Sequence, residues 1–321
     1  MEPPLDRSTT WPYVDGELGP FHYARNAHPV GVEAERQLGV LDGGEALLFP
    51  SGMGATTALV LGLLSPGSTI ALAQDAYYGT GVLLSELERW ELRHVLYDQT
   101  GPPPAGAELV WIEAPSNPLL TMPDFEAAAA HPGLVVCDAT AATPVLLRPL
   151  ERGCDFVLHS ATKYLAGHHD VLLGAVVCGR AEHAARLREL RTRTGIVAAP
   201  DAAWLLLRGL KTLEVRVARQ SETAATLAGR LAEHEAVRIV RYPGFGGLLS
   251  FDVADGEAAR RVETSTMLIV NATSLGGVAS TMETRHRWEG GRVPAGLLRL
   301  AVGLEPVDEL WHDLQQALEH V

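Results

Sequence analysis

Lysine is the residue that this sequence nearly lacks. Only two of its 26 basic residues are lysines, Lys163 and Lys211, and the rest are arginines. Arginine can replace lysine in solvation and ion pairing, but its guanidinium keeps its proton, whereas a desolvated lysine amine can condense with an aldehyde. A lysine that remains in such a sequence is therefore a candidate for amine chemistry.

Positive charge and long apolar runs are scarce as well. The net charge of -13 argues against nucleic acid or an anionic membrane as the main partner, because either would need a basic face. No apolar run approaches the ~20 residues of a membrane helix, and the first residues lack the pattern of an export signal. The three cysteines, Cys137, Cys154 and Cys178, lie in apolar segments and are expected to be reduced core residues of a cytoplasmic protein.

Strand-like and helix-like segments alternate over the first two thirds of the chain, which is typical of an α/β fold. With 321 residues, 47% of them hydrophobic, the chain can bury a large core and form two domains. The alternation stops near residue 200, where helical patterns begin to dominate. We predict an extended arm over residues 1–30, a large domain over residues 31–205 and a small C-terminal domain over residues 206–321.

Lys163 lies between two apolar runs, residues 155–159 and 171–177. We expect both runs to be strands, so that the amine lies at an edge of the sheet where ligands gather. Ser160 and Thr162 place two hydroxyl groups beside it. This pattern fits a lysine that binds the aldehyde of pyridoxal phosphate, with both hydroxyls on the phosphate group. A surface lysine in a turn would give the same pattern.

Asp138 ends the apolar run of residues 133–137, which has the pattern of a central parallel strand. A carboxylate buried there is costly unless it meets a positive partner. The protonated ring nitrogen of pyridoxal phosphate is such a partner, and the pairing keeps the ring an electron sink. An aspartate that caps the next helix is the alternative.

A phosphate site is indicated where a strand at residues 46–49 leads through small residues into a helical run at residues 57–64. In that arrangement free backbone amides and the helix dipole bind phosphate, and Gly52 and Met53 would supply the amides. Any tight α/β connection has a similar composition. Tyr77 follows the next strand and offers a ring for a planar cofactor, although a tyrosine at a strand end is also common packing.

Two further positions suggest anion binding. In the arm, Tyr23 and Arg25 are two residues apart and point the same way on an extended backbone, which suits a phosphate clamp for a neighbouring subunit. A solvated loop with two large residues would look the same. Arg299 lies inside the apolar run of residues 296–303, where an arginine needs an anion. We assign no residue as a metal ligand.

Taken in order, these motifs resemble the Cys/Met-metabolism family of pyridoxal phosphate enzymes, which includes cystathionine synthases and lyases. The resemblance runs nearly from end to end of the chain. It rests on Tyr23-Ala-Arg25, Ser51-Gly-Met53, Tyr77-Tyr-Gly-Thr80, Pro115-Ser-Asn-Pro118, Asp138-Ala-Thr140, Ser160-Ala-Thr-Lys163, Arg208-Gly-Leu-Lys-Thr-Leu213, Ser274-Leu-Gly276 and Arg299. It implies the aspartate aminotransferase-like fold (fold type I), with a mostly parallel seven-stranded sheet and a small α+β domain.

The resemblance also implies a role for each site residue. Lys163 would carry the cofactor and move protons, and Tyr77 would stack on its ring. Cofactor-binding roles fall to Gly52, Met53, Tyr77, Asp138, Thr140, Ser160, Thr162 and Lys163, joined by Tyr23 and Arg25 from a partner subunit of a homodimer within a tetramer. Arg299, with Ser274 and Asn117, would bind the α-carboxylate of an amino-acid substrate.

Departures from the family pattern bear on the reaction. Thr273 stands where many cystathionine γ-synthases and lyases have an acidic residue, and Tyr78 stands where a methionine γ-lyase has a small residue or cysteine. The tail with Arg287, Trp288 and Pro294 resembles actinobacterial cystathionine γ-lyases more than synthases. We therefore expect γ-elimination from cystathionine or a related amino acid, with a γ-replacement synthase or a β-lyase as the alternatives.

Overall fold

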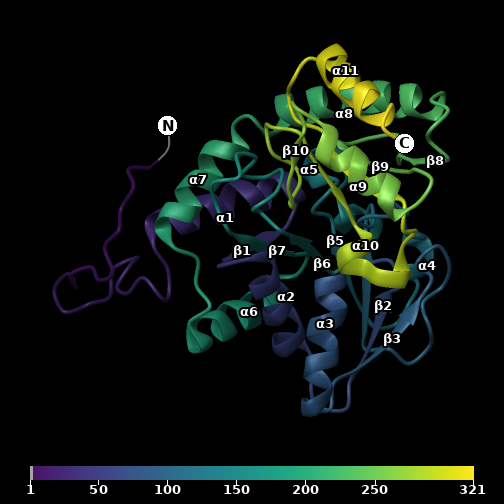
Figure 1. The fold of residues 1–321 in the computed structure, drawn as a ribbon. Helices are drawn as coiled ribbons and strands as arrows, with labels where there is room; N and C mark the ends of the chain where they lie inside the picture. The colour runs from purple at the N-terminus through teal and green to yellow at the C-terminus, as the bar shows by residue number, and fades with distance from the viewer. Residues whose placement is uncertain (1–2) are drawn as a thin grey trace.

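The computed structural model describes residues 3–321 and contains a large and a small β-sheet, each covered by helices (Figure 1). The large sheet has seven strands in the order β1-β7-β6-β5-β4-β2-β3. Only β7 runs antiparallel to its neighbours, and the strand pairs from β6 to β3 are parallel. The strands are β1 (Glu45–Phe49), β2 (Thr69–Ala73), β3 (Arg93–Tyr97), β4 (Leu109–Glu113), β5 (Leu134–Asp138), β6 (Phe156–His159) and β7 (Gly174–Cys178).

Helices cover both faces of this sheet, which explains why its central strands are apolar at every position. In β4, Val110 and Ile112 belong to the core on one face, and Leu109 and Trp111 belong to the core on the other. The first face packs against α1 (Pro29–Asp42), α4 (Phe125–Ala129), α5 (Thr143–Leu146) and α7 (Pro200–Leu210). The second face packs against α2 (Gly52–Leu63), α3 (Tyr78–Leu87) and α6 (Ala181–Thr194).

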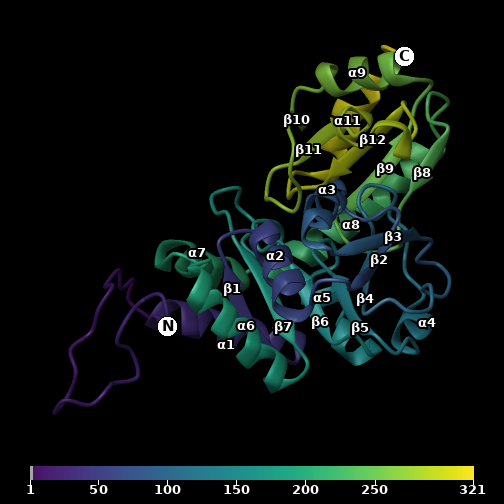
Figure 2. The same cartoon turned by 90° about the horizontal axis from the view of Figure 1, so that it is seen from below.

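The smaller C-terminal domain has a five-stranded sheet in the order β10-β11-β12-β9-β8 (Figure 2). Its elements are α8 (Leu213–Ala232), β8 (Ile239–Arg241), β9 (Leu248–Asp252), α9 (Gly256–Ser265), β10 (Val270–Asn271), β11 (Thr281–Thr284), α10 (His286–Glu289), β12 (Leu297–Ala301) and α11 (Val307–Leu318). One core joins this sheet to α8, α9 and α11. The predicted fold class is therefore confirmed.

One predicted helix start lies elsewhere in the structure, and one predicted domain limit falls within a helix. The helix expected from residue 57 begins at Gly52, because the Ser51 side chain caps it by accepting the N–H of Gly54 at 3.0 Å. The predicted domain limit between residues 205 and 206 falls inside α7, whose buried residues Leu206 and Leu207 belong to the core of the large sheet. The exact division into domains stays a prediction.

The arm leads away from the body of the chain (Figures 1 and 2). From residue 3 to residue 28 it contains no helix and only isolated bridges between Thr10 and Tyr23 and between Val14 and Glu17. Residues 1 and 2 of the predicted arm lie outside the described part. Helix α1 starts at Pro29, capped by the side chain of His28, so the arm ends two residues earlier than predicted.

Two expectations from composition can be compared with the structure. The three cysteines are free and buried, as predicted. Within residues 3–321, no helix combines the length and the apolar character that crossing a membrane would require.

Arg216 joins helix α8 to the turn that carries Lys163. Its side chain is buried and donates hydrogen bonds to the carbonyl oxygens of Tyr164 at 2.8 Å, Leu165 at 3.5 Å and Gly209 at 2.8 Å. Burial lowers the pKa of Arg216 to about 10, so the guanidinium stays charged at neutral pH. The position of the Lys163 turn therefore depends on a charged group from α8.

Replacing Arg216 by methionine should destabilise the protein by about 3 kcal/mol, because buried carbonyl groups lose their donor. The change in free energy of unfolding is measured by urea denaturation. Arg219→Met, at an exposed position of the same helix, is the matched control and should change stability by less than about 0.5 kcal/mol. Equal losses for the two variants would contradict the role of Arg216.

Candidate active site

A cavity of about 390 Å³ opens where the carboxyl ends of the parallel strands face residues of the small domain. All predicted site residues except Tyr23 and Arg25 line it. These are Gly52, Met53, Tyr77, Asn117, Asp138, Thr140, Ser160, Thr162, Lys163, Ser274 and Arg299. The structure thus brings together groups from widely separated parts of the sequence.

Lys163 lies in the turn after β6, and its Nζ donates a hydrogen bond to Oγ of Ser274 at 3.0 Å. Burial, assisted by the positive charge of Arg299, lowers the pKa of Lys163 to about 8. About a tenth of the amine is then uncharged at pH 7, a far larger share than for an exposed lysine. The uncharged amine is the form that attacks an aldehyde.

Ser274 connects this amine to the arginine across the cavity. Its φ of 86° lies in the left-handed region that residues other than glycine rarely adopt. In this conformation its hydroxyl accepts from Lys163, and its carbonyl oxygen accepts from Arg299 at 2.8 Å. Backbone strain of this kind persists where the surrounding contacts enforce it.

Asp138 is the last residue of β5, and its carboxylate lines the cavity. Thr140 donates to this carboxylate with its backbone N–H at 3.0 Å and with its hydroxyl. Burial raises the pKa of Asp138, while the Thr140 bonds and the positive charges of His159 and Lys163 oppose the rise. A carboxylate in this environment is suited to pair with a positively charged group placed in the cavity.

Backbone N–H groups without a helical acceptor lie at the start of α2. Gly52 and Met53 are its first two residues, so their N–H groups have no acceptor within the helix. A Cβ added to Gly52 would lie 3.0 Å from Cβ of Ser160, which shows how closely the two segments approach. The backbone amides and the Ser160 hydroxyl therefore border the same part of the cavity.

The Thr162 hydroxyl, predicted to bind phosphate, forms hydrogen bonds within the protein instead. Its hydroxyl donates to the carbonyl oxygen of Leu173 at 3.1 Å and accepts the N–H of the same residue at 2.9 Å. A hydroxyl has one hydrogen to donate. Its contact with a phosphate group stays a prediction, and donating to phosphate would require the bond to the Leu173 carbonyl to break.

Tyr77 supplies an aromatic wall. Its ring centroid lies 4.9 Å from that of Tyr78, and its backbone N–H donates to Oε2 of Glu113 at 2.6 Å. A Cβ on Gly79 would lie 2.5 Å from the Tyr77 ring, so glycine at position 79 makes room for it. Burial raises the pKa of Tyr77 to about 12, and its hydroxyl keeps its proton at neutral pH.

Arg299 reaches the cavity from β12 and is 3% exposed. It donates to Oδ1 of Asn117 at 2.8 Å and to Oε1 of Glu283 at 2.6 Å, besides the carbonyl of Ser274. The predicted carboxylate-binding residues are therefore in contact with one another. A substrate carboxylate would share the guanidinium with Glu283.

The sequence reasoning assigned no role to two buried acidic residues at the site, Glu283 and Glu113. Glu283 also accepts from Arg285 at 2.9 Å and from Nε1 of Trp288 at 3.1 Å, so it fixes the small-domain side of the cavity. Glu113 accepts the N–H groups of Tyr77 and Asn117 and so holds two predicted site residues. An acidic residue ending an apolar run is the signal that identified Asp138, and it was available for Glu113.

The donor set fits pyridoxal phosphate group by group. The Lys163 amine, with its lowered pKa, can react with the aldehyde of the cofactor, and the buried Asp138 carboxylate can pair with the ring nitrogen. The N–H groups at the start of α2 and a nearby hydroxyl can bind the phosphate group. Tyr77 offers a ring for a planar group. No other molecule has to be assumed to explain why these groups share one cavity.

Comparison with known proteins agrees with this fit. The family model described as Cys/Met metabolism PLP-dependent enzyme matches residues 1–319. The chain belongs to this family. The cystathionine gamma-synthase of Mycobacterium tuberculosis is 37% identical over 95% of this chain and 88% of that protein. The fold, the cofactor pyridoxal phosphate and the enzymatic nature of the chain are thereby confirmed.

Solved structures of the family superpose closely on this one. The metB protein of Corynebacterium glutamicum has a TM-score of 0.96 at 34% identity, covering 99% of this chain and 92% of that one. The cystathione gamma lyase CalE6 of Micromonospora echinospora has a TM-score of 0.94 at 35% identity, covering 99% and 93%. Both synthases and lyases of this family are thus similar to the chain.

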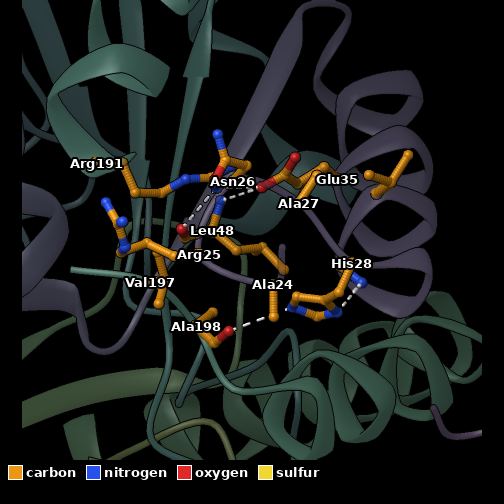
Figure 3. Close-up of a pocket in the computed structure, with 12 residues that line it drawn as sticks. Ala24, Arg25, Asn26, Ala27, His28, Glu35, Leu48, Arg191, Val197 and Ala198 are labelled. Carbon is orange, nitrogen blue, oxygen red and sulfur yellow. Dashed lines mark hydrogen bonds and ion pairs between the residues drawn. The ribbon is translucent and has the colours of Figure 1, made fainter. Parts of the chain in front are cut away.

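Tyr23 and Arg25 do not line the active-site cavity of their own chain. Arg25 lines a different, small hollow (Figure 3). Arg25 donates to the carbonyl oxygen of Thr192 at 2.7 Å, and its guanidinium lies 5.2 Å from the centre of the Tyr23 ring. Arg25 lines a hollow of about 20 Å³ at the root of the arm, beside the ion pair of Glu35 and Arg191. That hollow is too small for a cofactor.

The lowered pKa of Lys163 can be measured without the cofactor, because the chain has only two lysines. In the cofactor-free protein, acetylation of Lys163 should increase with pH through a midpoint near 8, since only the neutral amine reacts. Labelling at a series of pH values is followed by peptide mass spectrometry. Lys211→Arg removes the other lysine and should leave this profile unchanged; a midpoint near 10.5, the ordinary lysine value, would refute the assignment.

Proposed function

We propose that this chain is a carbon–sulfur lyase that uses pyridoxal phosphate to cleave cystathionine, or a related sulfur amino acid, by γ-elimination. The products from cystathionine and water are cysteine, 2-oxobutanoate and ammonia. The observation that carries the proposal is the Lys163 amine, which has a lowered pKa and lies between Ser274 and the buried charges of Asp138 and Arg299.

Each group has a step to perform. When bound, the cofactor withdraws electrons from the substrate carbon skeleton. Lys163 would hold the cofactor and afterwards take a proton from the α-carbon and then from the β-carbon of the substrate. Asp138 would pair with the ring nitrogen, supported by Thr140, and Tyr77 would lie against the ring.

The phosphate and the substrate would be held at opposite sides of Lys163. Gly52, Met53 and Ser160 border the phosphate side, which Thr162 would join on breaking its bond to Leu173. Arg299, with Asn117 and Ser274, would bind the α-carboxylate on the other side. Such fixed placement of both ends holds the reacting carbons near the amine.

The segment after β11 supports γ-elimination over γ-replacement as the proposed reaction. Trp288 lines the cavity and is fixed by its bond to Glu283, and it belongs to the segment that resembles actinobacterial γ-lyases. The similarity to the Mycobacterium tuberculosis synthase supports γ-replacement on an activated homoserine as the second candidate. A β-lyase reaction remains the third.

Incubation with cystathionine should release 2-oxobutanoate and cysteine in equal amounts, measured as oxoacid and as free thiol. A γ-synthase would instead form cystathionine from cysteine with O-acetyl- or O-succinylhomoserine, and a β-lyase would release pyruvate and homocysteine. Lys163→Ala should abolish the release of oxoacid, whereas Lys211→Arg should retain it. Absence of 2-oxobutanoate from cystathionine with the wild-type protein would reject γ-elimination.

We also propose that the site is completed by a second copy of the chain. Tyr23 and Arg25 lie outside the cavity of their own chain, on an arm that extends away from the body (Figure 1). An arginine beside an exposed tyrosine on such an arm suits a phosphate group in a neighbouring subunit. A homodimer, and a tetramer of two such dimers, would result. The free, buried cysteines support a reducing compartment, which we propose is the cytoplasm.

Mixing two inactive variants tests this arrangement. Lys163→Ala and Arg25→Ala should each lose most activity, but a heterodimer of the two contains one site with both residues intact. After dissociation and reassociation of an equal mixture, activity should return to about a quarter of the wild-type value. Mixing Lys163→Ala with Lys163→Ala/Arg25→Ala is the control and should give no recovery. No recovery in the first mixture would place Arg25 in its own chain's site or outside any site.

A further inference from the structure

A buried histidine–aspartate pair lies close to the active site and has no role in the reaction described above. Nε2 of His159 and Oδ2 of Asp42 are 2.9 Å apart, and both residues are 0% exposed. Within residues 3–321, neither Nδ1 of His159 nor Oδ1 of Asp42 has a hydrogen-bond partner. Two ionisable side chains completely removed from water require an explanation.

The pair lies on the opposite face of the sheet from the cavity. Leu158 lines the cavity, and its neighbour His159 must point to the other face because side chains alternate along a strand. Asp42, the last residue of α1, reaches His159 on that face, where α1 packs against the sheet. The imidazole therefore lies on the face of the sheet away from the cavity, one residue along β6 from a residue that lines the cavity.

The carboxylates around His159 favour the protonated form of its imidazole. Burial on its own lowers the pKa of His159, but the carboxylates of Asp42 and Asp138 outweigh burial, so that the pKa is raised overall. The β7 residue opposite His159 is Ala175, which has no charge. On its far side Asp42 borders a second cavity of about 360 Å³, with Glu151, Asp155 and Arg180.

The Asp138 carboxylate, at the end of the neighbouring strand, is the cavity group on which a charge at His159 acts. Strands β5 and β6 pair in parallel, with Asp138 opposite Leu158, one residue before His159. Thr140 also joins the two strand ends, because its hydroxyl donates to Asp138 and accepts the N–H of Ser160, the residue after His159. A positive charge at this place stabilises the ionised form of Asp138 through an interior of low dielectric.

We propose that the His159–Asp42 pair positions charge so that Asp138 stays ionised. The pair would thereby set the pH below which the protein loses affinity for the cofactor, which we call the acid limit of cofactor binding. Asp42 holds His159 protonated, and His159 in turn holds the Asp138 carboxylate ready for the ring nitrogen. The proposal rests on the proposed role of Asp138, but not on which sulfur amino acid is the substrate.

The test measures the dissociation constant of pyridoxal phosphate from the protein between pH 5 and pH 9, by absorbance titration of the cofactor-free form. Loss of the Asp138 charge should weaken binding at the acid end. In His159→Asn that loss should begin at a higher pH, because without the imidazolium the carboxylate takes up its proton sooner. Affinity at pH 9 should match the wild type, and at the acid end it should be weaker by roughly tenfold.

Two further variants separate electrostatics from packing. Asp42→Asn is nearly isosteric, leaves His159 without its anion and should move the acid limit the same way, while the double variant should move it no further than the larger single effect. Asp313→Asn is the matched control, because Asp313 is a buried acid that accepts the N–H groups of Met267, Leu268 and Ile269 far from the cavity. It should lower the unfolding temperature without moving the acid limit.

The outcomes distinguish this inference from the proposed function. An unchanged acid limit in His159→Asn and Asp42→Asn, or an equal loss of affinity at every pH, would overturn the inference. If the wild-type protein itself binds the cofactor equally at pH 5 and pH 9, the role of Asp138 fails as well. Because the readout is affinity and not turnover, failure to cleave cystathionine would leave the result interpretable.

Discussion

The site depends on burying charges of both signs at one edge of the large sheet. Coulomb interactions are strong where water is excluded, so each charge there alters the protonation of its neighbours. Burial and the charge of Arg299 lower the pKa of Lys163. Burial also makes the ionised form of Asp138 unfavourable until a positive group enters the cavity. The same constraint explains why Glu283 lies between two arginines.

The sequence was sufficient to predict the elements whose signal is local. An apolar run interrupted or ended by one charged residue identified Asp138 and Arg299, and the structure places both at the cavity. The direction of β7 was not predictable in this way. Its residues are as apolar as those of the parallel strands, and only its pairing with β1 and β6 makes it antiparallel.

The contacts that were missed join segments far apart in the chain. Glu283 acts through Arg285, Trp288 and Arg299, and no spacing in the sequence shows that these side chains converge. The bond between Thr162 and Leu173 likewise depends on how the loop after Lys163 returns to the sheet. Residue type predicted which chemistry is present, whereas the partners of each group required the three-dimensional arrangement.

Helix α8 is shared by both halves of the molecule. Leu213 and Val217 at its beginning belong to the core of the large sheet, and Leu227 and Leu231 near its end belong to the core of the small one. Its 20 residues span about 30 Å without interruption. The helix therefore connects the two cores as one continuous element. A movement of the small domain that keeps α8 straight would tilt this helix. Through the hydrogen bonds of Arg216, the tilt would also shift the turn that carries Lys163.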